Sequence, residues 1–278
     1  MKEAQGPKHA RNIEESMRRP HLLVATRESG VGGAERLVLD SLPELRRVFD
    51  VDVTTCPLPG EPRRALVPGG ETSALRVVRA DADLLYTHLW LPGVLARLGR
   101  ALGSRARWVH TVHFDDYRGL RFGGVRRWID RHWVYPGADR LVAVSPRVSA
   151  TLARERRDGG GVTLLENAVD MSRASAEPTP EAGAPDSRPQ GVVLGCVAML
   201  RREKGVDDLV RATARLVERG VDPTLRIAGE GPERRGLEML VRELGLEERV
   251  EFLGWVDRVE DAYRAFDVYV QPSRAESF

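Results

Sequence analysis

A regular alternation of strand-like and helix-like segments constrains this chain more than any other feature of its sequence. The strand-like runs of the first half lie at 21–26, 51–56, 83–89, 107–113, 140–145 and 162–166. They are short, rich in Val, Leu and Thr, and apolar on both faces, which is typical of a parallel sheet covered by helices on both sides. Apolar residues at helical spacing predict a helix over 34–48, directly after the first strand.

Residues 171–190 interrupt this alternation. They hold four prolines among Ala, Ser, Glu and Gly, with too few apolar residues to bury a core, so we predict an interdomain linker. The alternation then restarts, with strands expected at 191–199, 225–228, 250–253 and 268–271 and helices at 206–219, 234–244 and 260–266. The pattern predicts an α/β fold of two Rossmann-like domains, 20–170 and 191–278, after a disordered tail over 1–19.

The second of these domains is expected to be incomplete. No helix follows its fourth strand, 268–271, whereas a doubly wound sheet normally continues. An apolar parallel strand would then lie at a poorly covered edge, which favours aggregation. We therefore interpret the chain as a fragment that ends at Phe278.

Composition excludes several classes of function. Lys+Arg is 43 and Asp+Glu is 41, and a net charge of +2 gives no reason to expect nucleic-acid binding. The two cysteines, Cys56 and Cys196, lie in separate strand-like runs, which indicates a reducing compartment without a disulfide framework or a metal site. No apolar run approaches the ~18 residues that a membrane span needs, and the polar residues 1–19 do not read as a secretory signal, so we expect a cytoplasmic protein.

Ligands of parallel α/β sheets bind at the carboxyl ends of the strands, so the loops after strands carry the candidate sites. The first strand leads into Gly32 and Gly33 and then a helix with Glu35 in its first turn. Glycines let a ligand approach the backbone, and the free N–H groups of the helix N-terminus suit a phosphate or a sugar oxygen. The alternative is an ordinary glycine-rich turn.

Two histidines end strand-like runs of the first half. His113 is followed by acidic residues, and His88 closes the run at 83–89. Either imidazole could donate a hydrogen bond to a sugar hydroxyl or a phosphate. The alternative for His113 is a histidine satisfied locally by Asp115.

The second half has three comparable loops. Lys204 lies between a strand and a helix and is the only lysine outside the N-terminal tail of an arginine-rich chain. A compact ammonium enters a tight phosphate site that a planar guanidinium cannot. Gly229 and Gly231 form a turn that could pack against a nucleotide or be an ordinary strand-to-helix turn. Glu276, just past the last strand, could accept hydrogen bonds from sugar hydroxyls.

Taken together, these segments resemble the retaining GT-B glycosyltransferases of glycosyltransferase family 4. The matches occur in the family's order and span nearly the whole chain after the tail: Gly32-Gly33-Ala34-Glu35, Thr111-Val112-His113, Val142-Ala143-Val144-Ser145, Glu166-Asn167-Ala168-Val169-Asp170, Lys204-Gly205, Ile227-Ala228-Gly229-Glu230-Gly231-Pro232, Phe252-Leu253-Gly254 and Pro272-Ser273-Arg274-Ala275-Glu276-Ser277-Phe278. No single match is specific, whereas the ordered set is.

The resemblance implies a metal-independent transfer from a nucleotide-sugar donor to an acceptor, with retention of configuration and no cofactor. Lys204 would neutralise the donor diphosphate, and Gly33 would offer it backbone donors. His113 would contact the transferring sugar, and Glu276 would be the first glutamate of the family's E-x7-E motif. Gly32, Gly229 and Gly231 would join the donor site, and Glu35 and His88 the acceptor side. The acceptor is left open as a glycan, a lipid-linked compound or a small molecule.

Two departures from the family pattern matter. The arginine that the family often places before its lysine is Met199 here, and Arg201 is a possible substitute. The second glutamate of E-x7-E would lie beyond Phe278. On this interpretation the 278-residue chain alone is expected to have little transferase activity.

Two other functional classes remain open from the sequence. Nucleotide-sugar epimerases share the two-domain architecture and the donors, and the chain could also be an inactive fragment.

Segment 121–135 carries four aromatic residues among four arginines. Such a helix either docks on the sheet through its aromatics or rests on the inner face of an anionic membrane.

Overall fold

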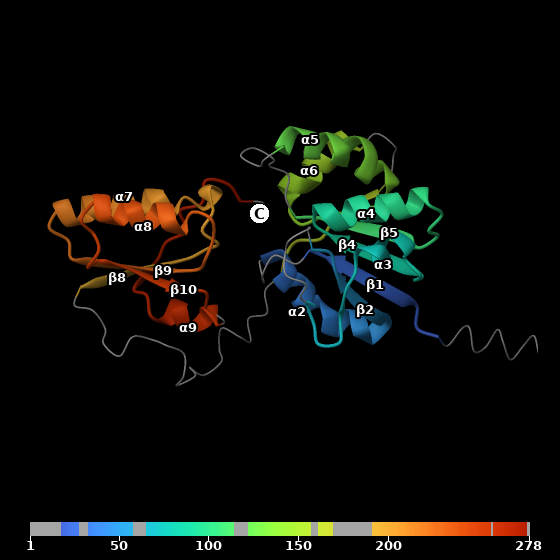
Figure 1. The fold of residues 1–278 in the computed structure, drawn as a ribbon, viewed down its shortest axis with the longest axis horizontal. Coiled ribbons are helices and arrows are strands. Elements are labelled where there is room, and N and C mark those ends of the chain that lie inside the picture. Colours follow the sequence, from blue (N-terminus) through green and yellow to red (C-terminus); the bar gives the residue numbers. More distant parts are fainter. Residues whose placement is uncertain are drawn as a thin grey trace, which may run out of the picture. The chain divides into compact units, whose positions relative to one another are not determined.

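The computed structural model describes residues 18–27, 33–57, 65–113, 122–156, 161–168, 191–256 and 258–276. They form two compact units, which we call unit 1 (18–168) and unit 2 (191–276) and describe separately. Each unit is a parallel sheet with helices on both faces (Figure 1). The predicted α/β class and the two Rossmann-like sheets are confirmed. The predicted linker (171–190) and all but the last two residues of the predicted tail (1–19) lie outside the described residues.

The described part of unit 1 has a seven-stranded sheet in the order β3-β2-β1-β4-β5-β6-β7. All its neighbouring strands are parallel. The direction of winding reverses between β1 and β4, so this pair forms the topological switch point, where ligands of such sheets bind. The strands are β1 His21–Thr26, β2 Asp50–Thr55, β3 Glu71–Thr72, β4 Leu84–His88, β5 Arg107–Val112, β6 Arg140–Ala143 and β7 Gly161–Leu164.

Helices cover both faces of this sheet. Val38 and Leu42 of α2 pack against β1 and β2 on one face. The larger core cluster, which surrounds the fully buried Trp108, includes residues of α3, α4 and α6. The bounds are α2 Gly33–Val48, α3 Ala74–Arg79, α4 Trp90–Ala101, α5 Gly123–Ile129, a π-helical turn Asp130–Val134, a 3-10 turn Tyr135–Gly137 and α6 Pro146–Glu155.

Unit 2 has a four-stranded sheet in its described residues, ordered β10-β9-β8-β11. Its elements are β8 Val192–Val197, η3 Arg202–Lys204, α7 Val206–Glu218, β9 Pro223–Ala228, α8 Arg234–Glu243, β10 Val250–Gly254, α9 Val259–Arg264 and β11 Val268–Tyr269. α7 and α8 lie on one face and α9 on the other (Figure 1). The winding reverses between β8 and β11. β11 is an exposed edge strand, as predicted, with Val268 47% and Tyr269 41% exposed.

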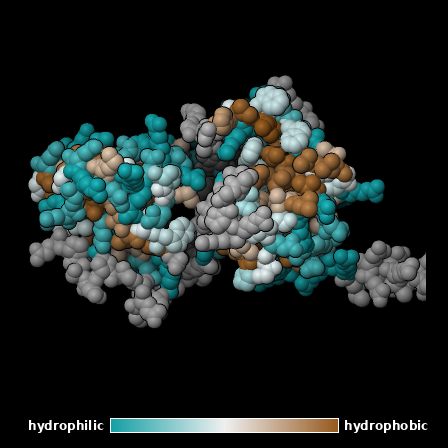
Figure 2. Space-filling view, in the orientation of Figure 1, coloured by the Kyte–Doolittle hydropathy of each residue, from teal (hydrophilic) through white to brown (hydrophobic). Residues whose placement is uncertain are grey.

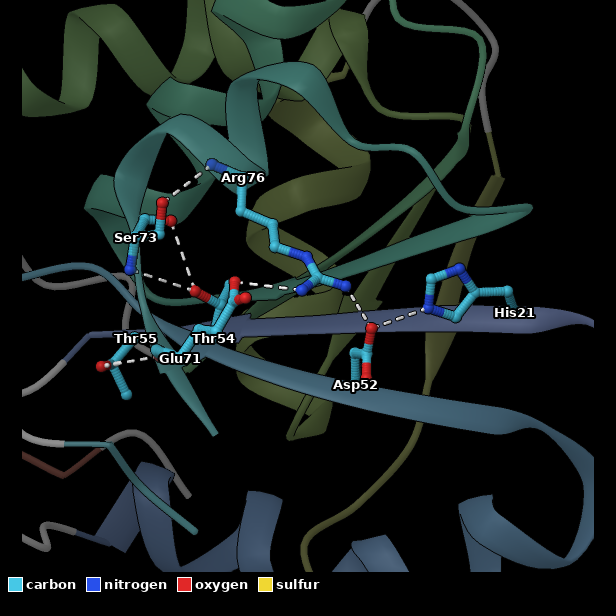
Figure 3. Close-up of polar contacts among 7 residues, drawn as sticks. All are labelled: His21, Asp52, Thr54, Thr55, Glu71, Ser73 and Arg76. Atoms are coloured by element: carbon cyan, nitrogen blue, oxygen red, sulfur yellow. Dashed lines mark hydrogen bonds and ion pairs between the residues drawn. The ribbon is translucent and has the colours of Figure 1, made fainter. Parts of the chain in front are cut away.

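Sequence analysis did not predict strand β3 or helix α3 at the edge of unit 1. A polar network holds the short strand β3 and helix α3 on β2 (Figure 3). Arg76 of α3 forms ion pairs with Asp52 and with Glu71, and His21 Nε2 lies 3.0 Å from the Asp52 carboxylate. Ser73 caps α3 by accepting a hydrogen bond from the Arg76 backbone N–H. The contacts of Asp52 with Arg76 and with His21 join residues far apart in sequence, so local periodicity could not reveal them.

Cys56 and Cys196 are buried free thiols, and no disulfide joins the described cysteines, as predicted. No helix in the described ranges combines the length and the apolarity that crossing a bilayer requires.

Close packing of α3 on α4 provides a test of the fold. A Cβ on Gly99 of α4 would lie 2.3 Å from the backbone oxygen of Val78 in α3. We expect Gly99→Ala to lower the free energy of unfolding by about 1 to 3 kcal/mol, because a backbone atom cannot move aside as a flexible side chain can.

Gly124→Ala in α5 is the matched control, since a Cβ there meets nothing within 4 Å. That variant should be neutral or more stable by up to about 1 kcal/mol. Urea unfolding measures both variants. Equal stabilities would contradict the described α3–α4 packing.

Candidate functional site

The predicted site residues gather into two groups, one in each unit, and both lie beside a topological switch point. In unit 2, Lys204 follows β8 and Glu276 follows β11, the two strands between which the winding reverses. In unit 1, His88 ends β4 and His113 follows β5. In both groups, residues that are far apart in the sequence come together.

Lys204 and Glu276 form an ion pair in unit 2. Lys204 Nζ lies 2.7 Å from Glu276 Oε1, and the side chains are 25% and 32% exposed. Gln271 Nε2 donates a second hydrogen bond of 3.0 Å to the same oxygen. Partial burial alone would raise the pKa of Glu276, but hydrogen bonds and the positive charge of Lys204 outweigh it, and the pKa is lowered. Glu276 is thus held as a carboxylate next to an ammonium.

Gly205 brings the two loops together. It adopts φ +63°, and a Cβ there would lie 2.2 Å from the backbone oxygen of Pro272. The Arg274 backbone N–H also donates to the Glu203 carbonyl over 2.8 Å. The loop after β11 therefore packs directly on the loop after β8, an approach that only glycine permits.

Arg274 is a residue that sequence analysis missed. Its guanidinium donates 2.8 Å hydrogen bonds to the Arg202 carbonyl and to Asp207, and it pairs with Asp208 at 2.6 Å. Both aspartates lie in the first turn of α7. Arg274 thus fixes the segment that carries Glu276 to the N-terminus of α7. Two adjacent aspartates after Gly205-Val206 were the available signal, but their partner lies 67 residues from Asp207.

Gly229 and Gly231 have a packing role. A Cβ on Gly229 would lie 2.0 Å from the Ala198 carbonyl oxygen, and one on Gly231 2.4 Å from that of Leu200. The Leu200 backbone N–H also donates to the Glu230 carbonyl over 2.9 Å. These glycines hold the loop after β9 against the loop that leads to Lys204. Contact of either glycine with a donor remains a prediction.

Arg201 precedes η3, and its exposed side chain makes no hydrogen bond or ion pair with the described residues. Met199 is partly buried. The structure leaves the Arg201 guanidinium available, while its substitution for the family arginine remains a prediction.

In unit 1 the two predicted histidines contact each other. His88 Nδ1 lies 3.0 Å from His113 Nε2. The partner of His113 among the described residues is therefore His88, whereas Asp115, the local partner considered above, lies outside them. His88 also stacks at 4.2 Å between ring centroids on Tyr86, whose hydroxyl accepts a hydrogen bond from Thr111.

A second polar cluster, which sequence analysis missed, lies behind the histidine pair. The Thr87 hydroxyl lies 2.8 Å from His110 Nδ1 and accepts a 2.8 Å hydrogen bond from the Trp108 indole. All three residues are buried. Their side chains point from β4 and β5 to the opposite face from Tyr86 and His88, because successive strand residues alternate. The cluster stabilises the ends of the strands that carry the pair.

The remaining predicted residues of unit 1 belong to the segment between β1 and α2 and to the first turn of α2. Gly33 begins α2, and Glu35 is buried in its first turn. Gly32 lies outside the described residues.

Two of the matched segments meet at the carboxyl ends of β6 and β7 in a pocket of about 360 Å³, lined by Val144, Ser145, Pro146, Glu166 and Asn167.

The described residues contain no group of three or more His, Cys, Asp or Glu side chains placed to hold a metal ion. Burial lowers the pKa of His113 to about 4 and that of His110 to about 3. It also lowers that of His88 well below its usual range, with further repulsion from His113 and His110. All three imidazoles are therefore neutral at pH 7.

This neutrality predicts a dependence of stability on pH. Below pH 6.5, the ordinary pKa of histidine, the unfolded chain binds protons that the folded chain does not. The free energy of unfolding of unit 1 should therefore fall as pH decreases from about 6.5 to 5. Urea unfolding followed by tryptophan fluorescence measures it.

His113→Gln should weaken this dependence by about one proton, since one titrating group is lost. His132→Gln, at an exposed histidine, is the matched control and should follow the parent chain. A His113→Gln variant with the parent's full pH dependence would contradict the assignment.

Known proteins resemble the chain in both sequence and fold. The family model described as Glycosyltransferase Family 4 matches residues 31–173, and that described as Glycosyl transferases group 1 matches 191–278. D-inositol 3-phosphate glycosyltransferase 2 of Catenulispora acidiphila is 31% identical over 223 residues, which cover 70% of this chain and 50% of that protein. 2-deoxystreptamine glucosyltransferase of Streptomyces kanamyceticus is 31% identical over 155 residues, 51% of this chain and 38% of that protein.

Among solved structures, Anabaena HepE in complex with UDP and glucose aligns with a TM-score of 0.70 at 19% identity, covering 93% of this chain and 76% of that one. The catalytic domain of starch synthase IV from Arabidopsis thaliana, bound to ADP and acarbose, aligns with a TM-score of 0.61 at 16% identity, covering 93% and 79%. These likenesses show the fold. The chain spans about half the length of the D-inositol 3-phosphate glycosyltransferases it matches. Because one family model alone covers more than half of the chain, the chain belongs to glycosyltransferase family 4.

Proposed function

We propose that this chain carries substrate-binding elements of a glycosyltransferase that moves a sugar from a nucleotide-sugar donor to an acceptor hydroxyl. The observation that supports it best is the Lys204–Glu276 pair at the switch point of unit 2. The ammonium suits a diphosphate and the carboxylate suits sugar hydroxyls, so one site offers complementary groups to both halves of such a donor. HepE, a structural neighbour, is described in complex with UDP-glucose.

In the proposed reaction, the bond between the sugar anomeric carbon and the diphosphate oxygen breaks. The acceptor oxygen bonds to that carbon, and its proton passes to the departing diphosphate. Negative charge develops on the departing diphosphate. Lys204 would stabilise this charge, which makes a metal ion unnecessary in the proposal. Arg201, exposed in the same loop, is placed to assist. Retention of configuration and the sugar contact of His113 rest on the family resemblance.

The family match favours a transferase over a nucleotide-sugar epimerase. Two relatives act on D-inositol 3-phosphate and on 2-deoxystreptamine, according to their names. We therefore propose a small polyhydroxylated acceptor, with Glu35 and His88 on the acceptor side. We place the reaction in the cytoplasm, with glycan or glycoside biosynthesis as its role.

Calorimetry with UDP, GDP and ADP tests the donor site. We expect Lys204→Met to weaken binding of the preferred nucleoside diphosphate about 10- to 100-fold, as for the loss of a charged hydrogen bond. Arg242→Met, at an exposed arginine of α8, should leave affinity unchanged.

Glu276→Gln separates the two roles that Lys204 could have. If Lys204 binds the diphosphate, this variant retains or improves nucleoside diphosphate affinity, because the ammonium loses a competing partner. If Lys204 only anchors Glu276, both variants should behave alike, and the proposal would be wrong.

We also propose a peripheral membrane contact for unit 1. Phe122, which precedes α5, is 65% exposed, and Val125 and Trp128, three residues apart on one face of α5, are 57% and 62% exposed. Figure 2 shows apolar surface over α4 and α5. Leu98 of α4 and Leu102, which follows α4, are also exposed. The end of segment 121–135 instead docks on the body of unit 1, because Tyr135 is buried and Trp133 packs on the core.

Sedimentation with anionic vesicles tests this contact. We expect binding at low salt that weakens at high salt, because arginines accompany the exposed aromatics. A Phe122→Ser/Trp128→Ser variant should lose it. Trp255→Ser, at a tryptophan 52% exposed in unit 2, should retain it. Absence of salt-sensitive binding by the parent chain would refute the proposal.

A further inference from the structure

The contact between His88 and His113 fixes a relation between the protons of the two rings. A neutral imidazole carries one N–H, on Nδ1 or on Nε2. The 3.0 Å contact joins His88 Nδ1 to His113 Nε2, so a hydrogen bond needs a proton on one of these atoms and a lone pair on the other. As a result, whether His88 Nε2 carries a proton determines whether His113 Nδ1 carries one.

Two proton arrangements satisfy the bond. If His88 Nδ1 donates, His88 Nε2 is an acceptor, and the proton of His113 lies on Nδ1, which is then a donor. If His113 Nε2 donates, His88 Nε2 is a donor and His113 Nδ1 an acceptor. In both arrangements the two rings have the same tautomer, and their remaining nitrogens have opposite hydrogen-bonding character.

Among the described residues, His88 Nε2 is also buried without a partner. Thr26 Oγ1 at the end of β1 and Trp90 Nε1 just after β4 are likewise buried without a partner in the part of the chain that the structure describes. Buried polar atoms are rarely left unpaired, so this grouping at the switch point indicates a ligand that is itself polar.

The backbone between His88 and Trp90 supports the same conclusion. Leu89 adopts φ +68° and ψ +170°, a conformation normally restricted to glycine. A leucine held there is strained, and it fixes the directions in which β4 ends and α4 begins. Such strain concentrates at binding sites.

We propose that His88 and His113 act as one hydrogen-bonding unit, in which a ligand hydroxyl bound at His88 Nε2 sets the character of His113 Nδ1. His88 is then a positioning residue for His113. Naming the ligand as the hydroxylated acceptor rests on the proposed function, whereas the coupling itself does not.

The unliganded pair has a preferred arrangement. A buried N–H without an acceptor is rarer in proteins than an unpaired acceptor. His88 Nε2 therefore carries the lone pair, and both protons lie on Nδ1. A ligand hydroxyl that donates to His88 Nε2 stabilises this state and keeps His113 Nδ1 a donor. An ether or carbonyl oxygen at the same place cannot donate and would require both rings to change tautomer.

Long-range proton–nitrogen NMR correlation of the 15N-histidine-labelled chain at pH 7 tests the coupling, because it reports which ring nitrogen is protonated. We expect His88 and His113 both as Nδ1–H tautomers. In His88→Asp, whose carboxylate near the position of Nδ1 can only accept, His113 should carry a proton on Nε2. In His88→Asn, whose amide can donate from near the position of Nδ1, His113 should keep Nδ1–H.

Opposite tautomers in the parent chain would overturn the proposal. So would a His113 without a proton on Nε2 in a folded His88→Asp variant. If His88→Asp does not fold, the tautomers of the parent chain still decide. The experiment needs neither donor nor turnover, so it can succeed where the proposed transferase function fails, and the reverse.

Discussion

The carboxyl ends of parallel strands lie along one edge of their sheet. Where the direction of winding reverses, the loops after two neighbouring strands lead to opposite faces of the sheet. This constraint organises both units. In unit 1 the reversal lies between β1 and β4, beside Thr26 and His88, and in unit 2 between β8 and β11, beside Lys204 and Glu276. Residues from distant parts of the sequence meet there because the topology leaves a space that helices do not cover.

Backbone contact between loops then gives unit 2 its charge pair. Gly205, Gly229 and Gly231 each occupy a position where a Cβ would overlap a neighbouring carbonyl. With the loops in contact, Lys204 and Glu276 satisfy each other without a ligand. Under the proposed function, a diphosphate that competes for Lys204 would free Glu276 for a sugar. Unit 1 has neutral groups at its switch point instead, since burial keeps His88, His110 and His113 uncharged.

Much of this architecture could be predicted from local pattern. The strand over 21–26 was placed at its observed bounds, and the helix expected over 34–48 begins one residue earlier, at Gly33. Runs such as 140–145 were predicted too long, because apolar residues continue into the loop after β6 ends at Ala143. Strand-end position alone pointed to Lys204, Glu276, His88 and His113. It could not pair them, nor reveal Arg274 or the network of Arg76, because those contacts depend on which strands become neighbours.

A crystal structure of the chain with a bound nucleoside diphosphate is the most direct test of whether Lys204 binds the diphosphate. We predict a phosphate oxygen within about 3 Å of Lys204 Nζ, beside Gly205 and the N-terminus of α7. Glu276 should then be released from Lys204 or share it with the phosphate. A diphosphate bound away from the loops after β8 and β11, with the Lys204–Glu276 pair unchanged at 2.7 Å, would contradict it.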